Sequence, residues 1–352
     1  MRNLTLATAV AGVALMGLVS TTPAQAQDSI TVSSWGGSFQ EAERKAFYEP
    51  AAAALGIIIK EDTTNGIADV RAQVMANAVK WDITEQGSNT CAQLKSEGHI
   101  EPLDYSVITN TDGIDPGLVD SHWIGIIYYS TIIAWSTDTY GKDGPQNWAD
   151  FFNVEKFPGT RAMYYKPYYN LESALIADGV LFGEVYETLK TEAGQDRAFA
   201  MLEELKPHVA VWWKSGAQSM QLIKDGEVDI ISIWNGRIKG AIDDGAKADF
   251  TFNQGIFDFD CLMIPKGAPN KELAMRAINE FIKPENQAML PRYIAYGPVN
   301  QKAFETGLIT PEQAAAINSA PQNAKVQLVL DPNFWIGRYD LLQERFDEMI
   351  QE

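Results

Sequence analysis

The feature that most constrains the fold of this chain is a regular alternation of short β-branched runs with longer segments of helical periodicity. Residues 30–34 combine Ile, Thr and Val and predict a strand, whereas Phe39, Ala42 and Ala46 recur at the spacing of one helix face, which predicts a helix over 39–55. Strands that alternate with helices pair as a mostly parallel sheet with helices on both faces. The sequence thus predicts an α/β fold, with further strands at 57–60 and 81–84 and helices at 67–78 and 90–97.

A second unit of the same kind follows a break at residues 137–148, where glycine and proline interrupt the alternation. A long Ile- and Tyr-rich strand is predicted before this break, at 124–135. With 352 residues, the chain is long enough for two domains of about 150 residues each. Beyond the break, strands are expected at 161–165, 209–213, 228–234 and 257–264, helices at 172–178, 195–205 and 273–282, and a largely helical tail over 311–350.

The first 26 residues have the three parts of a secretory signal peptide. Arg2 gives a positive start, residues 4–19 form an apolar run, and the small residues that signal peptidase requires end at Ala26. An uncleaved membrane anchor is the alternative, but this run is shorter than the roughly 20 residues needed to span a bilayer. We expect export to the periplasm, with cleavage after Ala26.

The two cysteines, Cys91 and Cys261, would then lie in a compartment that permits disulfides. Two is the smallest number of cysteines that can pair within one chain. The alternative is a pair of separate buried thiols. We expect a disulfide that closes a long loop of the chain.

Charge and motifs narrow the possible functions. The chain carries 46 Asp and Glu against 28 Lys and Arg, a net charge of −18, which argues against a broad nucleic-acid interface. It contains no G-x-S-x-G, H-E-x-x-H, P-loop or G-x-G-x-x-G pattern, and its three histidines are best explained as structural or solvated. We expect no catalytic activity, no cofactor and no metal site, and keep a secreted enzyme with a cleft between two lobes as an alternative.

Polar residues follow the predicted strands of the first unit, where an open parallel sheet binds its ligands. Trp35, Gly37 and Ser38 come after the first strand and open a helix, whose glycines let backbone N–H groups approach a ligand. Glu85 and Ser88 follow the strand at 81–84 and are expected to face the same crevice. Both groups are candidate ligand-binding residues, with ordinary turns as the alternative.

The second unit contributes candidates of another kind. Trp234 offers a ring face to an alkyl chain or a cation, and Arg237 can clamp a carboxylate through two parallel hydrogen bonds. Asp258 and Asp260 alternate with phenylalanines, so both acids lie on one face of a strand. Buried carboxylates need a partner, and we consider two: an ammonium group of the ligand, or a salt bridge within the protein.

Seven motifs in order identify a family that the chain resembles: SSWGG (33–37), WDI (81–83), GHIEPL (98–103), WADFF (148–152), FPG (157–159), SIWNGR (232–237) and IPKGA (264–268). Together they are similar to periplasmic solute-binding proteins of the spermidine/putrescine ABC-transporter type. The resemblance implies a two-lobe periplasmic-binding-protein fold with crossover hinge strands, and a ligand trapped as the lobes close. Residues 27–137 and 256–300 would form lobe 1, residues 138–255 lobe 2, and residues 301–352 C-terminal helices packed mainly on lobe 2.

The same resemblance implies a monomer that delivers a small molecule to an inner-membrane ABC permease, with a separate ATPase supplying the energy. Trp35, Trp234, Asp260 and Tyr296 match ligand-binding positions of the polyamine binders, whereas Asp258 stands where the spermidine binders have Trp. A stretch that includes Lys166 and Tyr168 replaces some of the acids of the polyamine binders. Lys166, with Arg161 and Arg237, suits an anionic group of the ligand. The candidate ligand contacts are therefore twelve residues: Trp35, Gly37, Ser38, Glu85, Ser88, Lys166, Tyr168, Trp234, Arg237, Asp258, Asp260 and Tyr296.

The ligand predicted from these departures is a small amine that also carries an anionic group, such as γ-aminobutyrate, with a polyamine kept as a possibility. Two further ligands of the same fold stay open. A carboxylate or phosphonate would use the basic residues, and ferric iron would use tyrosine pairs at 128–129, 164–165 and 168–169. The alternative is that these tyrosines only pack between strands.

Overall fold

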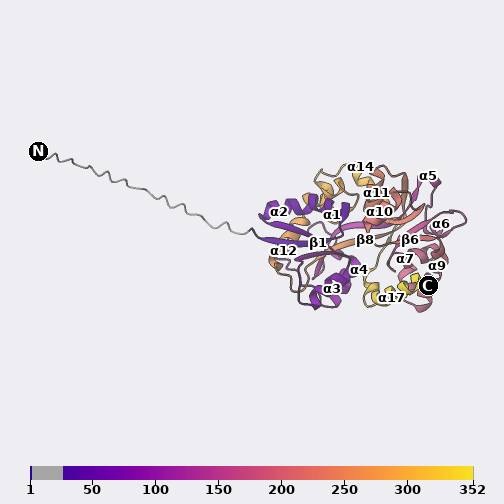
Figure 1. The fold of residues 1–352 in the computed structure, drawn as a ribbon, viewed down its shortest axis with the longest axis horizontal. Coiled ribbons are helices and arrows are strands. Elements are labelled where there is room, and N and C mark those ends of the chain that lie inside the picture. Colours follow the sequence, from indigo (N-terminus) through magenta and orange to yellow (C-terminus); the bar gives the residue numbers. More distant parts are fainter. Residues whose placement is uncertain (2–26, 352) are drawn as a thin grey trace.

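The structure is a computed structural model that describes Met1 and residues 27–351; the expected signal peptide cleavage falls outside the described residues. Within the described part, a mixed ten-stranded sheet is flanked by helices, which confirms the predicted α/β class (Figure 1). The strands lie in the order β2-β1-β3-β8-β4-β7-β5-β6, with β9 and β10 paired to the central strands. None of the described helices is long and apolar enough to cross a bilayer.

One end of the sheet consists of the first three strands, which run parallel: β1 (Ser29–Ser34), β2 (Ile58–Thr63) and β3 (Ile83–Gly87). The helix predicted after β1 is continuous but has a π-helical middle, and Gly56 ends it in the left-handed conformation that glycine adopts without strain. The helices of this half are α1 (Gly37–Glu43), η1 (Arg44–Tyr48), α2 (Glu49–Leu55), α3 (Ile67–Met75), α4 (Ser88–Ser96) and α12 (Lys271–Phe281). Figure 1 shows α1, α2, α3 and α12 near β1, and α4 closer to the middle of the molecule.

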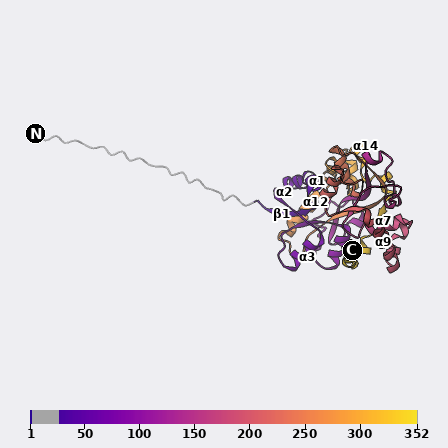
Figure 2. The same ribbon diagram turned by 45° about the vertical axis from the view of Figure 1, so that its right-hand side comes forward.

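The opposite end of the sheet repeats this plan with three other parallel strands: β5 (Arg161–Tyr164), β6 (Val209–Trp213) and β7 (Ile230–Trp234). In the view turned by 45°, α7 and α9 again lie at this end, away from α2 and α3 (Figure 2). The helices here are α5 (Thr137–Tyr140), α6 (Trp148–Phe152), α7 (Asn170–Ala177), α8 (Val185–Leu189), α9 (Glu192–Leu205), α10 (Gly216–Lys224) and α11 (Asn235–Asp243).

Two long antiparallel strands, β4 (Trp123–Ser136) and β8 (Ala248–Met263), join the two ends. β3 pairs with the C-terminal part of β8, and β7 pairs with the C-terminal part of β4, so both long strands run through both halves. β8 begins nine residues before the predicted strand at 257–264. The earlier residues were missed because they are half-exposed and polar, and Asn253-Gln254-Gly255 has the composition of a turn.

The C-terminal segment contacts both halves. Gly337, which follows α16 (Pro332–Trp335), donates its N–H to Gln93 Oε1 of α4 at 2.8 Å. Phe346 of α17 (Tyr339–Gln351) packs edge-on against Trp212 of β6 and Tyr165 beyond β5. Five elements precede α16 along the chain: α13 (Pro284–Gln287), β9 (Gly297–Pro298), α14 (Pro311–Ala316), α15 (Pro321–Ala324) and β10 (Leu328–Val329). The division into lobes at the expected boundaries stays a prediction.

A disulfide joins Cys91 of α4 to Cys261 of β8, which confirms the predicted pairing. The bond holds the helix that follows β3 against the strand that pairs with β3. It therefore fixes α4 against the paired strands β3 and β8.

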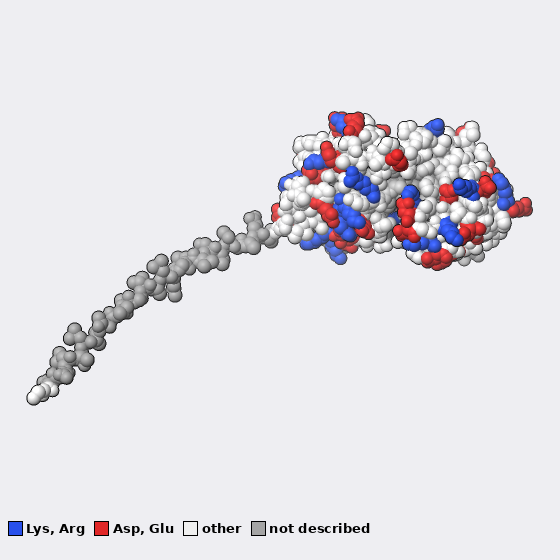
Figure 3. Space-filling view, turned by 90° about the horizontal axis from the view of Figure 1, so that it is seen from above, with Lys and Arg blue, Asp and Glu red and all other residues white. Residues whose placement is uncertain are grey.

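Charged side chains are mostly at the surface, where acidic and basic groups are interspersed on the face shown in Figure 3. A few are fully buried instead, among them Glu43, Glu85, Asp258, Asp260 and Arg237. A buried charge is costly unless it is paired, hydrogen-bonded or neutralised. The burial of these charged residues therefore needs an explanation from their partners or from a ligand.

Candidate ligand-binding pocket

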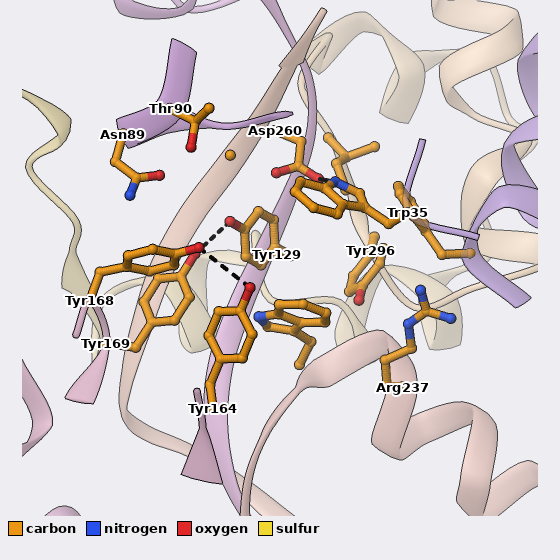
Figure 4. A pocket seen from close by; sticks show the side chains of 14 residues that line it. Trp35, Asn89, Thr90, Tyr129, Tyr164, Tyr168, Tyr169, Arg237, Asp260 and Tyr296 are labelled. Carbon is orange, nitrogen blue, oxygen red and sulfur yellow. Dashed lines mark hydrogen bonds between the residues drawn. The ribbon is translucent and has the colours of Figure 1, made fainter. Parts of the chain in front are cut away.

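A pocket lies where the carboxyl ends of the parallel strands from both halves meet β4 and β8. This is the edge of an open α/β sheet at which ligands are expected. Fourteen residues line it (Figure 4): Trp35, Phe39, Gly87, Asn89, Thr90, Ile127, Tyr129, Tyr164, Tyr168, Tyr169, Trp234, Arg237, Asp260 and Tyr296.

Aromatic rings form most of the pocket wall, and they brace one another. Trp234, at the end of β7, meets Tyr164 and Tyr129 edge-on, with ring centroids 5.3 and 6.2 Å apart. Tyr164 in turn stacks on the buried Trp213 at 4.5 Å. Rings locked in this way present faces that attract cations and edges that pack against alkyl chains.

Asp260 is the acidic group of the pocket wall. It lies on β8, opposite Gly87 of β3, and its Oδ2 accepts a hydrogen bond from Trp35 Nε1 at 2.9 Å. Burial raises the pKa of Asp260 well above its usual range, and the neighbouring Asp258 carboxyl raises it further. The Asp260 carboxyl is thus poorly solvated and would gain from a cationic partner.

Arg237 supplies the basic group, from the first turn of α11. Its Nη1 donates to Ser38 Oγ at 3.0 Å and its Nη2 to the Gly36 carbonyl at 3.3 Å, both in the other half of the molecule. Burial lowers the pKa of Arg237, yet a guanidinium stays charged in proteins. Among the described residues it has no carboxylate within ion-pairing distance, so its charge is available to a ligand anion.

Two glycines leave room for the Arg237 guanidinium. A Cβ on Gly216, the first residue of α10, would lie 2.5 Å from Arg237 Nε and 3.0 Å from Trp234 Cε3. A Cβ on Gly37 would lie 3.3 Å from Arg237 Nη1, and Gly37 has φ +61°, which disfavours other residues. Gly37 and Ser38, both predicted as ligand contacts, therefore contact Arg237 and do not line the pocket.

Asp258 lies behind the pocket wall, where hydroxyl groups surround it. Its carboxylate accepts from Ser88 Oγ at 2.5 Å, Tyr129 Oη at 2.9 Å and Tyr169 Oη at 2.8 Å. Among the described residues Asp258 forms no salt bridge, the second partner considered from the sequence. Asp258 and Ser88 instead orient the two tyrosines that line the pocket.

The other predicted residues are placed as follows. Tyr296 and Tyr168 line the pocket, as do Trp35 and Trp234. Lys166 lies outside it, in a more open adjacent hollow with Lys214, and its Nζ donates to Tyr339 Oη at 3.0 Å. Glu85 is fully buried behind Asp260 and does not reach the pocket.

Arg161, which the sequence grouped with the anion-binding residues, has a structural role. Its buried guanidinium donates to the backbone carbonyls of Phe151, Gly159 and Phe157 at 3.0, 2.8 and 2.6 Å. These bonds hold the loop before β5 and leave Arg161 far from the pocket lining.

Several lining residues were missed or given another role from the sequence. Tyr129, Tyr164 and Tyr169 belong to the tyrosine pairs that were assigned to packing or to iron, and Phe39 was assigned to a helix core. Burial raises the pKa of Tyr129 and Tyr169 well above the usual value of 10, and the Asp258 charge adds to this. The remaining missed residues are Asn89, Thr90 and Ile127, whereas Gly87 lies between Glu85 and Ser88 and was expected to open onto the same crevice.

Comparisons with known proteins agree with this architecture. The family model for bacterial extracellular solute-binding proteins matches residues 52–324. A γ-aminobutyric acid-binding protein of Pseudomonas aeruginosa is 33% identical over 335 residues, which cover 95% of this chain and 94% of that protein. A spermidine/putrescine-binding periplasmic protein of Escherichia coli is 27% identical over 243 residues, which cover 66% of this chain and 67% of that protein.

A solved structure extends the likeness to the whole fold. The crystal structure of the PBP MotA from A. tumefaciens B6 in complex with glucopine superposes with a TM-score of 0.89 at 45% sequence identity. The match covers 92% of this chain and 99% of that chain. The family and these relatives are solute-binding proteins. The chain therefore belongs to the bacterial extracellular solute-binding protein family, among the substrate-binding proteins of ABC transporters, as its motifs predicted.

Proposed function

We propose that the protein captures a small solute that carries both an ammonium and a carboxylate group, of the γ-aminobutyrate type. One observation carries this proposal: buried Asp260 and buried Arg237 lie on the wall of the same aromatic pocket, and neither has an ion-pair partner among the described residues. Figure 4 shows Asp260 and Arg237 at separate places on that wall, with Trp35 and Tyr296 between them. An ammonium beside Asp260 and a carboxylate beside Arg237 would pair both charges.

Polyamines are less well matched to this pocket. A second ammonium group would need a second exposed acid, but Asp258 is already surrounded by three hydroxyl donors. It would also meet the charge of Arg237 in a confined, poorly solvated space, where like charges repel strongly. The γ-aminobutyric acid-binding relative supports the same choice.

A second candidate is a longer amino-acid conjugate. The open hollow that holds Lys166 and Lys214 shares Trp35, Tyr164 and Trp234 with the pocket. A ligand with an extension could therefore keep its charged groups in the pocket and place the rest in this hollow. The relative solved with glucopine supports including such conjugates in a ligand screen.

The capture mechanism follows from which half supplies each contact. Trp35, Phe39 and Asn89 come from the β1–β3 half, whereas Tyr164 and Trp234 come from the β5–β7 half. A ligand that touches both halves stabilises the closed form relative to the open one. We propose that the exported protein, cleaved after Ala26, acts as a periplasmic monomer and delivers its ligand to an inner-membrane permease.

Calorimetric titration and thermal shift with γ-aminobutyrate, putrescine, spermidine and glucopine test this proposal. γ-Aminobutyrate should raise the melting temperature more than either polyamine. Arg237→Gln should weaken its binding by about 10- to 150-fold, which corresponds to the roughly 1.5–3 kcal/mol of a charged hydrogen bond.

Lys166→Gln is the matched control, because Lys166 lies outside the pocket. It should leave γ-aminobutyrate binding unchanged and weaken only ligands that extend into the hollow. Tighter binding of putrescine than of γ-aminobutyrate, or unchanged γ-aminobutyrate affinity in Arg237→Gln, would refute the assignment of the two charged groups.

A further inference from the structure

Behind Asp260 the protein buries two more carboxyl groups, Glu43 of α1 and Glu85 of β3. Both are shielded from solvent, with at most 1% of each residue exposed. The hydroxyl of Ser34, at the end of β1, contacts both carboxyl groups: Glu43 Oε2, and Glu85 Oε2 at 2.7 Å. Glu85 pairs with Leu262 and Gly87 pairs with Asp260 between β3 and β8, so Glu85 and Asp260 are diagonal neighbours on one face of the sheet, and Asp260 lines the pocket. The four residues thus form a continuous chain from the pocket wall to the interior.

Counting hydrogens shows that this chain holds at least one proton. A serine hydroxyl has a single hydrogen and can donate it to only one of its two carboxyl neighbours. The other contact requires that the carboxyl group donate to Ser34 Oγ, so Glu43 or Glu85 must be neutral. Glu43 Oε1 and Glu85 Oε1 also have no hydrogen-bond partner, a situation that a neutral acid tolerates better than a buried carboxylate does.

The surroundings reinforce this conclusion. Burial raises the pKa of Glu43, and raises those of Glu85 and Asp260 well above their usual range. Arg237 is the cation that acts on Glu43 and Glu85, and its bonds go to Ser38 and Gly36. The other titratable groups that face the chain are acids or phenols: Tyr48, Glu61, Tyr129, Tyr164, Tyr169, Asp258 and Tyr296.

We propose that Glu43, Ser34, Glu85 and Asp260 form a proton-holding chain, and that an ammonium group entering beside Asp260 displaces one proton from it to solvent. In this exchange the ammonium keeps its own hydrogens, a carboxyl O–H bond breaks, and the released proton passes to water or buffer. The positive charge of the ammonium group replaces that of the released proton. Capture of the solute is thereby weakened by acid, and Glu85 sets that dependence without touching the ligand. The identity of the entering cation rests on the proposed function.

The chain itself can be tested without any ligand. When a carboxyl group has a higher pKa folded than unfolded, the native state binds more protons, so stability falls as the pH rises from the unfolded pKa to the folded one. Wild type should therefore lose stability between pH 5 and pH 8 relative to Glu85→Gln, with a slope difference of about one proton. Urea unfolding at several pH values measures this difference.

Glu41→Gln is the matched control, because Glu41 is an exposed acid of α1, the helix that carries Glu43, and is paired with Lys45. It should not flatten the slope. If Glu85→Gln does not fold, Glu43→Gln serves in its place. Infrared absorption of protonated carboxyl groups in wild type near neutral pH provides a further readout, and its absence would overturn the proton-holding chain.

Calorimetry with γ-aminobutyrate in buffers of different ionisation enthalpy tests the exchange. Wild type should release a proton on binding, and Glu85→Gln should release measurably less. Equal proton release in the two proteins, or an equal slope of stability with pH, would overturn the proposal. If γ-aminobutyrate does not bind to wild type, the proposed ligand is wrong, whereas the slope and infrared results still decide whether the chain holds a proton.

Discussion

Replacing Gly216 by alanine tests the position of the Arg237 guanidinium from outside the pocket. The added methyl carbon would lie 2.5 Å from Arg237 Nε, 3.0 Å from its Cζ and 3.0 Å from Trp234 Cε3. Cβ atoms essentially never approach heavy atoms within 3.0 Å, so the guanidinium must move. Gly216 does not have a positive φ, so the backbone accepts alanine without strain and the side chains must yield.

The displaced guanidinium loses its alignment with Ser38 Oγ and the Gly36 carbonyl. It also loses its alignment with the ligand carboxylate that we propose it binds. Loss of one charged hydrogen bond costs about 1.5–3 kcal/mol, so the dissociation constant for γ-aminobutyrate should rise about 10- to 150-fold. Overpacking should cost roughly 1–3 kcal/mol of folding stability, offset in part by the better helix propensity of alanine.

Calorimetric titration measures the affinity, and urea unfolding monitored by circular dichroism measures the stability. Gly240→Ala in α11 is the control, because its nearest neighbour is the flexible end of Met220 at an ordinary 3.6 Å. The control should gain up to about 1 kcal/mol of stability and keep wild-type affinity. Wild-type affinity in a folded Gly216→Ala protein would contradict the proposal that Arg237 binds the ligand carboxylate.

Three further results are expected. Replacing Cys91 and Cys261 by alanine opens a loop of 170 residues and should cost about 5 kcal/mol in the chain-entropy account; an unchanged urea midpoint would contradict it. Asp258→Asn weakens the acceptor of three buried hydroxyl groups, so unfolding should become easier by about 1–3 kcal/mol and ligand titration should show a weaker site; a neutral effect on both would rule out its orienting role. Burial raises the pKa of Glu172 to about 7, so stability should fall as the pH rises from about 4.5 to 7, by on the order of 3 kcal/mol, and Glu172→Gln should remove this fall in a pH series of melting temperatures.

The parallel parts of the fold could be predicted because their strands are short, β-branched and flanked by glycine turns. Strand β1 and the end of β7 were placed correctly, and with them Trp35 and Trp234. The first half of β8 could not be predicted, because it is stabilised by pairing with β4 more than by burial of its own side chains. Local sequence patterns do not predict which distant strand a segment pairs with.

The site illustrates a similar limit. A period of two correctly put Asp258 and Asp260 on one face of β8, but it does not tell which of the two a tyrosine covers. Tyr169 covers Asp258 from 89 residues away, at a φ of +69° that no residue pattern predicts. Glu85 was predicted as a ligand contact because it lies at a strand end. That position does not tell whether its side chain reaches the pocket or is buried behind it.

The long β4–β8 pair has a consequence for how ligand preference can change in evolution. Tyr129 and Asp258 pair across these strands, and Asp260 also pairs with Gly87 of β3, so all three lie near the junction of the two halves. We expect a substitution that adapts this stretch to another cargo to change also how readily the two halves move relative to each other. We therefore expect ligand specificity and flexibility to change together, and transfer of the recognition residues to a different scaffold to require both β4 and β8.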